Sequence, residues 1–502
     1  MKLLEDIFVL DLANNHQGSL SHAKNIINQY SKIIKKQKIK ATIKFQFRNI
    51  DTLIHPEYKK FEDNKHISRF KSTKLSINQY QELIKLIKAN KLYTCCTPFD
   101  EVSVDLVKEL DFDIVKIASC SAKDWPLIEK VSLLNKPIIF STGGLTLDEI
   151  DDLVSFFEHK GCDFGIMHCV SLYPTKHNDF NFQFIERLCN RYPNYIIGWS
   201  THEDPDNYHA VKIAQAKGAK MFEKHIGLET KENKLNKYSC TPKQFEKWVE
   251  SYKYSVECCG NSIKKISDEE ISAISTLLRG VYAKKNLKAG YKLKKSDILF
   301  AMPYNKNQVD SGNFKEGSVL KKDIQAMNPI YKDDIRGKNT SGVNELKSAI
   351  HEVKGMLSEA KIYLNSSFEV EYSHHYGMKN FKKTGACIIN CINRAYCKKI
   401  IVMLPGQHHP PHFHPKKEET FQVLHGDLTV YLNGNEKKLL PGETLLIQSG
   451  VWHSFQSKTG CIFEEVSTTH YNNDSVYKDQ KINAMQRKER KTIVDHWGRF
   501  QI

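Results

Sequence analysis

The segment from residue 406 to residue 453 contains side chains of the kind that bind metal ions. His412 and His414 are two positions apart, so on a β-strand both imidazoles leave the same face. Glu419 follows five residues later, and His453 comes after a second pair of strand-like segments bounded by glycines. Three imidazoles and one carboxylate make a ligand set for a divalent transition metal. The alternative is a histidine-rich loop beside a β-barrel that binds no metal.

A second group of polar residues is spread over the first half of the chain. They stand at the C-terminal ends of apolar, strand-like segments: Asp11, His16, Lys44, Gln46, Thr97, Lys116, Ser119, Ser141, Thr142, His168, Tyr173, His202, Glu223 and His225. A serine or threonine in such a place could simply cap the next helix. Lys44 and Lys116 do not fit that explanation, because they lie inside apolar strands and a buried ammonium is costly unless it is paired. Two lysines and several hydroxyls that converge predict a ligand with a phosphate or carboxylate group.

Two of these residues are histidines that could share one metal ion. His202 and His225 end the seventh and eighth predicted strands, and Glu223 lies on the same strand face as His225. Imidazoles on neighbouring strand ends can hold a divalent metal whose other positions are filled by water and substrate. The pattern alone leaves a purely structural role for the pair equally open.

Strand-like and helix-like segments alternate through the first half of the chain. A long excursion at 47–75 follows the second strand, and a last helix is predicted at about 241–257. Strands that are each followed by a helix call for a parallel sheet. Eight such units have the size of a (β/α)8 (TIM) barrel of the α/β class, whose strand ends meet at one mouth. The predicted strands are residues 7–12, 41–46, 92–96, 113–117, 137–141, 163–169, 195–200 and 220–226.

Eight short motifs of this region resemble those of bacterial sialic acid (N-acetylneuraminate) synthases in order and spacing. They are DLANNHQGS, IKFQ, CTPFD, VKIAS, STGG, HCVSLYPT, GWSTHEDPDN and FEKHI. The resemblance covers the whole predicted barrel, residues 1–262. It implies an enzyme that condenses phosphoenolpyruvate with an N-acylated, mannosamine-type aldehyde, giving a nonulosonic (sialic-acid-like) acid and phosphate.

The same resemblance implies roles for single residues. His202 and His225 match the two ligands of a Mn²⁺-like ion, and Glu223 matches a catalytic carboxylate. We expect Asp11, Lys44 and Lys116 to belong to the catalytic group as well. Contacts to phosphoenolpyruvate match Lys44, Thr97, Lys116, Ser119 and Ser141, with Ser171 near the place of a family asparagine. Gln46 and Tyr173 match contacts to the sugar, and Asn236 stands in the loop that borders it.

Three positions depart from the pattern of that family. Asp11 replaces a glutamate that is one methylene longer, Asn236 replaces an acidic residue, and Met302 stands before Pro303 where the family has an arginine that touches the acyl group. These changes indicate an acceptor other than N-acetylmannosamine, for instance a further modified or deoxygenated hexosamine. They also leave open a barrel that binds a sugar acid without making it.

The rest of the chain divides into smaller parts. Residues 263–339 resemble the small α+β SAF (antifreeze-like) domain, which in sialic acid synthases covers the barrel mouth of a partner subunit; the resemblance therefore implies a homodimer. Residues 340–365 are predicted to be linker and helix, with the linker at 338–350 and the helix at 351–364.

Residues 366–502 resemble an all-β cupin barrel with a C-terminal tail. The first cupin motif fits Gly406, His412, His414, Glu419 and Gly426, and the second fits Gly442, Gly450 and His453. His374, His375 and His470 are further candidates for its pocket, although ordinary polar roles would explain them. The HxH-then-KEE run is similar to that of sugar isomerases and epimerases. A second divalent metal and a role in sugar isomerisation, epimerisation or binding are therefore expected, and an isomerase active only in the cupin is an alternative.

Composition limits the compartment and the partners. The 502 residues are too many for one core. The 13 scattered cysteines without a CxxC pair suit reduced thiols, and no signal peptide or long apolar run is visible, so we expect a cytoplasmic protein without membrane contact. The net charge of +16 is spread along the chain without a nucleic-acid motif, so we expect no nucleic acid and a few lysines that serve an anionic substrate.

Overall fold

A computed structural model describes residues 2–60, 65–200, 202–261, 264–336, 341–365 and 367–494. The chain divides into two compact units, Met1–Lys265 and Ile266–Ile502. None of the described helices is both long enough and apolar enough to cross a membrane.

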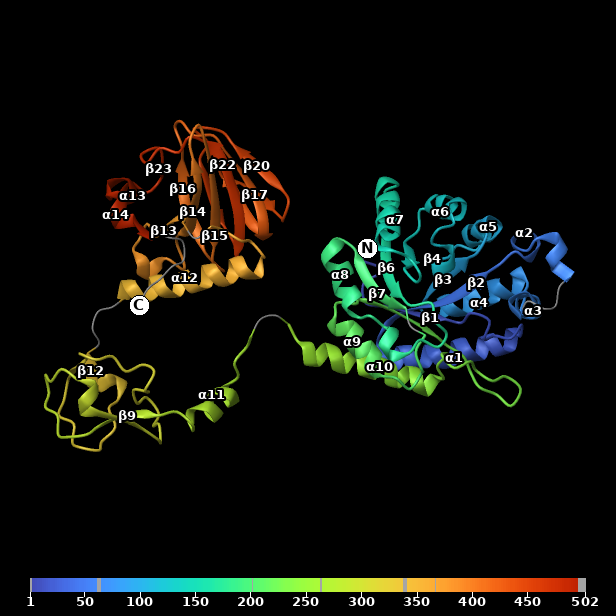
Figure 1. Ribbon diagram of the computed structural model, residues 1–502, viewed down its shortest axis with the longest axis horizontal. Helices are drawn as coiled ribbons and strands as arrows, with labels where there is room; N and C mark the ends of the chain where they lie inside the picture. Colours follow the sequence, from blue (N-terminus) through green and yellow to red (C-terminus); the bar gives the residue numbers. More distant parts are fainter. Residues whose placement is uncertain are drawn as a thin grey trace. The chain divides into compact units, whose positions relative to one another are not determined.

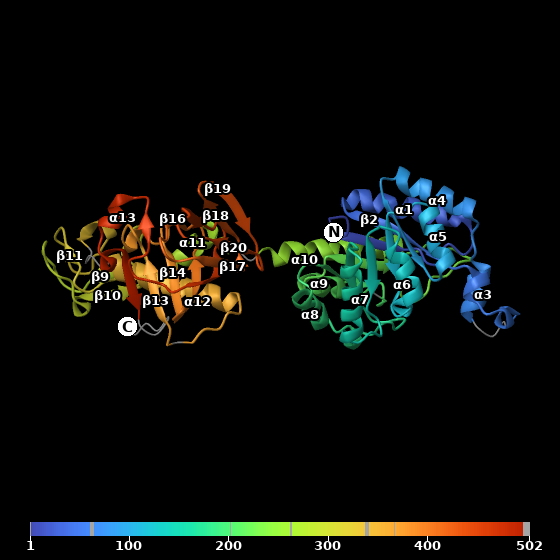
Figure 2. The ribbon, with the colours of Figure 1, turned by 90° about the horizontal axis from the view of Figure 1, so that it is seen from above.

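The first unit is a closed barrel of eight parallel strands in chain order, with helices around the outside (Figures 1 and 2). Every predicted strand is confirmed within two residues at each end. The strands are β1 (Ile7–Asp11), β2 (Lys40–Phe47), β3 (Tyr93–Pro98), β4 (Ile114–Ile117), β5 (Ile138–Ser141), β6 (Phe164–Cys169), β7 (Ile196–Ser200) and β8 (Met221–His225).

The helices that cover the barrel start at polar caps. Ser76, Thr146 and Thr241 each form a capping box with a Gln or Glu three residues later. The helices are α1 (Leu20–Gln37), α4 (Ile77–Ala89), α5 (Glu101–Glu109), α6 (Trp125–Ser132), α7 (Leu147–His159), α8 (Gln183–Arg191), α9 (His209–Ala216) and α10 (Pro242–Cys259). The excursion after β2 contains the short helices α2 (Ile50–Leu53) and α3 (Lys65–Ser72).

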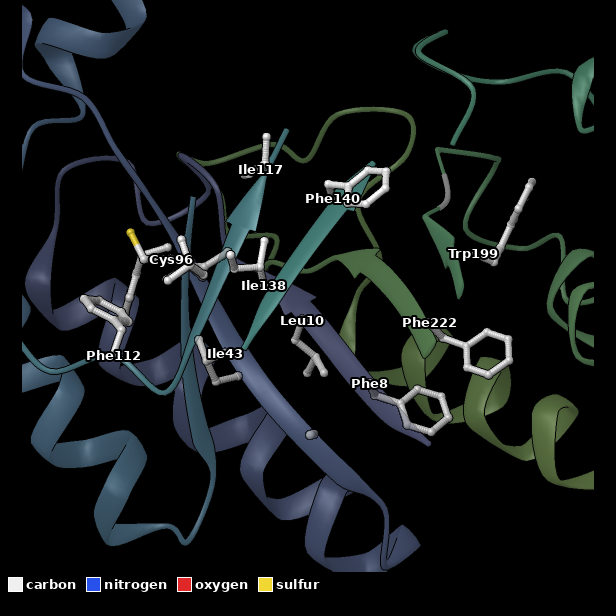
Figure 3. Close-up of a cluster of buried hydrophobic side chains, with 14 of the residues drawn as sticks. Phe8, Leu10, Ile43, Cys96, Phe112, Ile117, Ile138, Phe140, Trp199 and Phe222 are labelled. Atoms are coloured by element: carbon white, nitrogen blue, oxygen red, sulfur yellow. The ribbon is translucent and has the colours of Figure 1, made fainter. Parts of the chain in front are cut away.

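Outward-facing apolar side chains of the strands pack under these helices (Figure 3). Phe8 of β1 and Phe222 of β8 stack at a centroid distance of 5.6 Å, and both meet Trp248 of α10 edge-on. Since successive residues of a strand face opposite sides, the neighbours of these aromatic residues point into the barrel. The outer layer therefore fixes which side chains can reach the mouth.

The second unit begins with a small domain and ends with a double-sheeted β domain. The small domain has one helix, α11 (Asp268–Ser275), and two short sheets, β9 (Gly280–Ala283) with β10 (Ile298–Ala301) and β11 (Val319–Leu320) with β12 (Ile335–Arg336). Its own core contains Val281, Leu293 and Ile330. Assignment of these residues to a SAF domain remains a prediction.

The C-terminal domain has the two sheets expected of a cupin, with seven and five strands. The seven-stranded sheet has the order β20-β17-β22-β15-β14-β13-β24 and the other has the order β19-β18-β21-β16-β23. The strands are β13 (Glu369–Ser373), β14 (Ala386–Asn393), β15 (Tyr396–Met403), β16 (His408–Phe413), β17 (Glu419–Gly426), β18 (Leu428–Leu432), β19 (Asn435–Leu439), β20 (Thr444–Ile447), β21 (His453–Gln456), β22 (Cys461–Thr468), β23 (Val476–Tyr477) and β24 (Lys491–Val494).

One expected boundary in this region is wrong. Helix α12 (Ser341–Glu359) begins ten residues before the predicted start at 351, inside the predicted linker. Helix α12 lies along the seven-stranded sheet (Figure 1). Its residues Ala349, Ile350, Val353 and Leu357 pack on that sheet, and this packing stabilises a segment whose sequence is polar at its start. The polar tail also joins the domain, because β24 pairs with β13 at the sheet edge; residues 495–502 lie outside the described residues.

Candidate functional site

Four charged side chains form a buried cluster inside the barrel. Lys44 Nζ lies 3.0 Å from Asp11 Oδ2 and 3.1 Å from Glu223 Oε1, and Lys116 Nζ lies 2.8 Å from Glu223 Oε2. All four side chains are at most 5% exposed. The register of the parallel sheet aligns Asp11 with both Lys44 and His225, so residues far apart in sequence meet at one level. The two predicted lysines thus have carboxylate partners, as their burial requires.

Electrostatics keeps this cluster ionised. Burial favours the neutral form of Glu223, but the charges of Lys116 and Lys44 outweigh it and hold its pKa far below the ordinary value. The pKa of Asp11 is also lowered, since Lys44 and His225 overcome the effect of burial. Lys44 has a raised pKa because Asp11 and Glu223 overcome its desolvation. The lysines thus keep Glu223 ionised, and an ionised carboxylate can accept a hydrogen bond from a water molecule and orient it.

The two barrel histidines lie side by side next to the cluster. Their ring centroids are 5.3 Å apart, and His225 Nδ1 is 3.5 Å from Asp11 Oδ2. His202 Nδ1 donates to the carbonyl of Val170 at 3.3 Å, which leaves Nε2 as an acceptor. Burial lowers the pKa of His202 to about 3 and also lowers that of His225. Neutral imidazoles with free acceptor nitrogens are the form that binds metals, so the pair fits a divalent ion.

Two tyrosines border the histidines at the mouth. The ring of Tyr173 is 4.3 Å from that of His202, and the ring of Tyr238 is 5.1 Å from that of His225. Tyr173 is 56% exposed, so the histidine pair lies near an open surface. Asn236 is turned toward the backbone: its Oδ1 accepts from the amides of Tyr238 and Ser239, which shapes the loop that carries Tyr238.

Two of the predicted substrate contacts, Ser119 and Ser171, meet at Gly143. Ser119 Oγ accepts from the Gly143 amide at 3.1 Å, and a Cβ atom on Gly143 would lie 2.7 Å from Ser119 Oγ and 2.2 Å from Ser171 Oγ. Only glycine therefore lets these two hydroxyls approach each other. Thr97 Oγ1 is buried and has no hydrogen-bond partner among the described residues, and Ser141 is also buried. Such hydroxyls can serve a ligand's oxyanions.

Some strand-end residues do not reach the mouth, and some residues that do were not predicted. His168 faces the helix layer, where it bonds the carbonyl of Phe180 and packs on Trp199. Thr142 Oγ1 accepts from the Cys169 amide. Ser200 was missed although it precedes His202 by two residues on β7; its hydroxyl donates to Glu223 Oε1 at 3.3 Å.

Gln46 also has both ends of its amide in use. It donates to Asp11 Oδ2 at 3.0 Å and accepts from Arg48 Nη2 at 2.7 Å. Because arginine can only donate, the orientation of this amide is determined. Arg48 and Tyr238 were not predicted as site residues. Arg48 follows the end of a strand and Tyr238 lies in a loop, so neither belongs to the pattern of polar strand ends.

The C-terminal domain brings its predicted metal ligands together. The ligand atoms of His412, His414 and His453 lie within 4.8 Å of one another. Each Nδ1 lies 3.0 Å from a backbone carbonyl, of Pro410, Asp474 and Val451 respectively, so each Nε2 is left as an acceptor. Glu419 Oε1 is 2.9 Å from His453 Nε2, and that nitrogen has no hydrogen-bond donor opposite it. Acceptors that converge in this way fit a divalent cation.

A cavity of about 290 Å³ opens on three of these ligands, His412, His414 and Glu419. Charged pairs fill its walls: Glu465 with Lys399 and Lys417, and Glu371 with Arg487 and Lys491. His470 lines the cavity as expected, and so does His409, which was not predicted. His374 instead bonds Thr492, and His375 packs against His409. The paired charges and the narrow volume suit a small polar ligand better than an apolar one.

Comparisons with known proteins found matches for the barrel and for the C-terminal domain. The sequence model of the NeuB family matches residues 33–264, and that of the cupin domain matches residues 399–463. A solved structure, described as spore coat polysaccharide biosynthesis protein E from Chromobacterium violaceum, is 36% identical with a TM-score of 0.64; the match covers 66% of this chain and all of that one.

Two curated relatives have named activities. The N,N'-diacetyllegionaminic acid synthase of Campylobacter jejuni is 26% identical, over 63% of this chain and 98% of that protein. The N-acetylneuraminate-9-phosphate synthase of Drosophila melanogaster is 29% identical, over 59% of this chain and 87% of that protein. Both matches leave more than a third of this chain uncovered.

Substitution Glu223→Gln should destabilise the barrel in a pH-dependent way. At pH 7 it leaves Lys116 buried without a carboxylate, which costs about 3 kcal/mol or more. Because the pKa of Glu223 is lowered in the fold, its contribution is complete above the unfolded value of about 4 and is lost as pH falls toward the folded value. Thermal unfolding measured from pH 7 to pH 3 should show that the difference in melting temperature between the variant and wild type becomes smaller as the pH falls. A constant difference would contradict this account; Glu82→Gln, at an exposed ion pair, is the control.

Substitution Gly143→Ala should weaken the binding of phosphoenolpyruvate at least tenfold, about the loss of one charge-assisted hydrogen bond, because the added methyl displaces Ser119 and Ser171. Calorimetric titration measures this. Gly161→Ala is the matched control: its backbone has a φ of +66° and its Cβ would meet no atom within 4 Å, so it strains the fold without touching the site. If Gly143→Ala and wild type bind phosphoenolpyruvate with equal affinity, Ser119 and Ser171 do not belong to the ligand site.

Proposed function

The chain belongs to the NeuB family, and we propose that its barrel is a nonulosonic acid synthase, which joins phosphoenolpyruvate to an N-acyl amino sugar and releases phosphate. The observation that carries this proposal is the buried cluster of Lys44, Lys116, Asp11 and Glu223 beside a neutral histidine pair. The named activities of the two curated relatives support it.

The cluster is suited to a substrate with a carboxylate and a phosphate. Its two ammonium groups and two carboxylates cancel, so each lysine is held charged and dehydrated without a ligand. When phosphoenolpyruvate enters, Lys44 and Lys116, which are already dehydrated, can donate further hydrogen bonds to the oxyanions of the substrate while they stay paired with Glu223. Thr97, Ser119, Ser141 and Ser171 would complete the contacts to phosphate and carboxylate.

The reaction uses the residues in separate roles. A divalent metal such as Mn²⁺, held by His202 and His225, would supply Lewis acidity for the sugar carbonyl. The methylene carbon of phosphoenolpyruvate forms the new bond to the carbonyl carbon, and its central carbon becomes cationic. Water adds there, and the bond from this carbon to the phosphate oxygen breaks. Of the two protons of this water, one balances the proton gained by the sugar oxygen, and the other leaves with the phosphate as the keto group forms. Glu223 accepts a hydrogen bond from that water and so orients it, and the lysines neutralise the departing phosphate.

The acceptor end of the pocket favours a modified hexosamine. Asp11 is committed to Lys44 and Gln46, and the Asn236 side chain shapes its own loop. Asp11 is shorter than the expected glutamate and is already engaged, and Asn236 is neutral, so we propose an acceptor that differs from N-acetylmannosamine. The homodimer and the SAF domain as a cover of the partner's barrel are kept as part of this proposal. A barrel that binds a sugar acid without turnover is the alternative, which the assay below decides.

For the cupin we propose a second divalent transition metal, held by His412, His414, Glu419 and His453, and a role in isomerising, epimerising or binding a sugar. Support comes from the convergent acceptor nitrogens and from the charged cavity beside them. Such a site polarises a carbonyl while neighbouring acids and bases move protons. This second activity would be separate from the chemistry of the barrel.

Incubation of the full chain with phosphoenolpyruvate, Mn²⁺ and a panel of N-acyl hexosamines should release phosphate and form a 2-keto acid. His202→Ala should lower kcat/KM at least a hundredfold, since the neutral metal ligand is lost. His209→Ala, at an exposed position of α9, should behave as wild type. A folded protein that releases no phosphate with any acceptor would contradict the proposal, as would full activity of His202→Ala.

Metal analysis should separate the two sites. The full chain should hold a transition metal through dialysis, and His453→Ala should lose the cupin ion while the phosphate release of the barrel persists. Loss of two equivalents of metal per chain in His453→Ala, or an unchanged metal content, would contradict the assignment of His453 to the cupin site. Activity on sugars that remains after barrel variants but vanishes in His453→Ala would identify the cupin as the principal enzyme.

A further inference from the structure

Arg48 is a cation in the barrel whose surroundings do not explain its charge. Its guanidinium carbon lies 3.8 Å from the ring centre of Phe99 and 4.2 Å from that of Phe70. Its only described hydrogen bond goes from Nη2 to Gln46 Oε1. Among the described residues, no carboxylate oxygen lies within 4.0 Å of it. The side chain is half-buried, and the guanidinium keeps donors that are free to serve a ligand.

A cavity of about 360 Å³ adjoins this guanidinium. Its lining includes Asn14, Gln46, Arg48, Thr73, Lys74 and Tyr80. The volume is in the range of pockets that hold small organic ligands. The cavity thus provides room for a sugar beside the strand ends of β1 and β2, with a cation in its wall.

The acidic residues of the same cavity do not neutralise Arg48. Asp51 and Asp105 have side chains that are 81% and 65% exposed, and they pair with Lys59 and Lys130. Glu109 is exposed on α5. The acids therefore stand at the solvent side, and the guanidinium is the charged group of the sheltered side. Burial lowers the pKa of Arg48 to about 10, which leaves it charged at neutral pH.

Arg48 is also connected to the reacting centre. Gln46 bridges it to Asp11, which contacts Lys44 and lies 3.5 Å from His225. A sugar whose carbonyl lies at the histidine pair can therefore direct its other end toward the cavity. The remaining nitrogens, Nε and Nη1, make no hydrogen bond to described residues and present the donor geometry that matches an oxyanion.

We propose that Arg48 binds an oxyanion, a phosphate monoester or a carboxylate, carried by the acceptor sugar at the end away from its carbonyl. This inference rests on the proposed synthase function of the barrel. It makes Arg48 a specificity residue: the acceptor is recognised by its charge at one end and by its carbonyl at the other. Met302 lacks a charge where the family resemblance expects an arginine, so the barrel itself would supply a cation for the acceptor.

The experiment compares three acceptors: an N-acylhexosamine 6-phosphate, the analogue with a 6-carboxylate, and the neutral N-acylhexosamine. Wild type, Arg48→Met, Arg48→Lys and the surface control Arg191→Met are assayed for phosphate release from phosphoenolpyruvate. Methionine keeps an apolar stem between Phe70 and Phe99, and matching thermal unfolding confirms the fold of each variant. Comparison of the 6-phosphate acceptor with the 6-carboxylate acceptor identifies which oxyanion the site recognises.

Wild type should prefer one charged acceptor. Arg48→Met should lower kcat/KM for that acceptor by roughly 10- to 100-fold, mainly through KM, and leave the neutral acceptor within about twofold. Arg48→Lys should recover part of the loss. Equal preference of wild type for neutral and charged acceptors would overturn the inference. An equal loss for all three acceptors, seen in kcat, would also overturn it, because Arg48 would then act only by positioning Gln46.

Failure of the proposed function gives a different result. If wild type turns over no acceptor, calorimetric titration with the two charged sugars decides the inference separately. Binding that Arg48→Met abolishes and Arg191→Met retains upholds the oxyanion site in a barrel without synthase activity. Absence of binding, or binding that is unchanged in Arg48→Met, overturns it.

Discussion

The barrel depends on the burial of two ammonium groups with two carboxylates at one level of the sheet. Lys44 and Lys116 reach Glu223 from β2 and β4, and Asp11 of β1 shares Lys44. Each charge alone would be expensive to bury, but together they cancel and remain ionised. The cluster keeps the lysines available for an anionic substrate, and the two ammonium groups lower the pKa of Glu223 and keep it ionised. The histidine pair and the serines around Gly143 surround this centre.

The two proposed metal sites share one physical principle and differ in their surroundings. In both, burial lowers the pKa of imidazoles (His202, His225, His412 and His414), and in most of these residues a backbone carbonyl lies at Nδ1. The barrel pair lies beside half-exposed Tyr173, where a large substrate can enter. The cupin set opens on a cavity of about 290 Å³ with paired charges in its walls. The barrel is therefore suited to joining two substrates, and the cupin to a single small one.

Sequence periodicity was enough for the barrel, because strands buried on both faces are apolar and helices begin at capping residues. It also placed His412, His414, Glu419 and His453 together, since their spacing fits a strand pair. The sequence does not show how neighbouring strands align, so the carboxylate partners of Lys44 and Lys116 could not be predicted from it. His168 was expected at the mouth, but the alternation of a strand turns it to the helices. Arg48 and the early start of α12 depend on tertiary packing, which periodicity does not show.

The central claim is that water attacks the central carbon of phosphoenolpyruvate and that phosphate leaves with the bridging oxygen. Phosphoenolpyruvate labelled with ¹⁸O at that bridge tests it most directly, in a turnover with an accepted amino sugar and analysis of both products by mass spectrometry. The account predicts the label in inorganic phosphate and none in the keto group of the acid. Label retained in the keto acid would mean cleavage between phosphorus and oxygen, and would contradict the roles given to Lys44, Lys116 and Glu223.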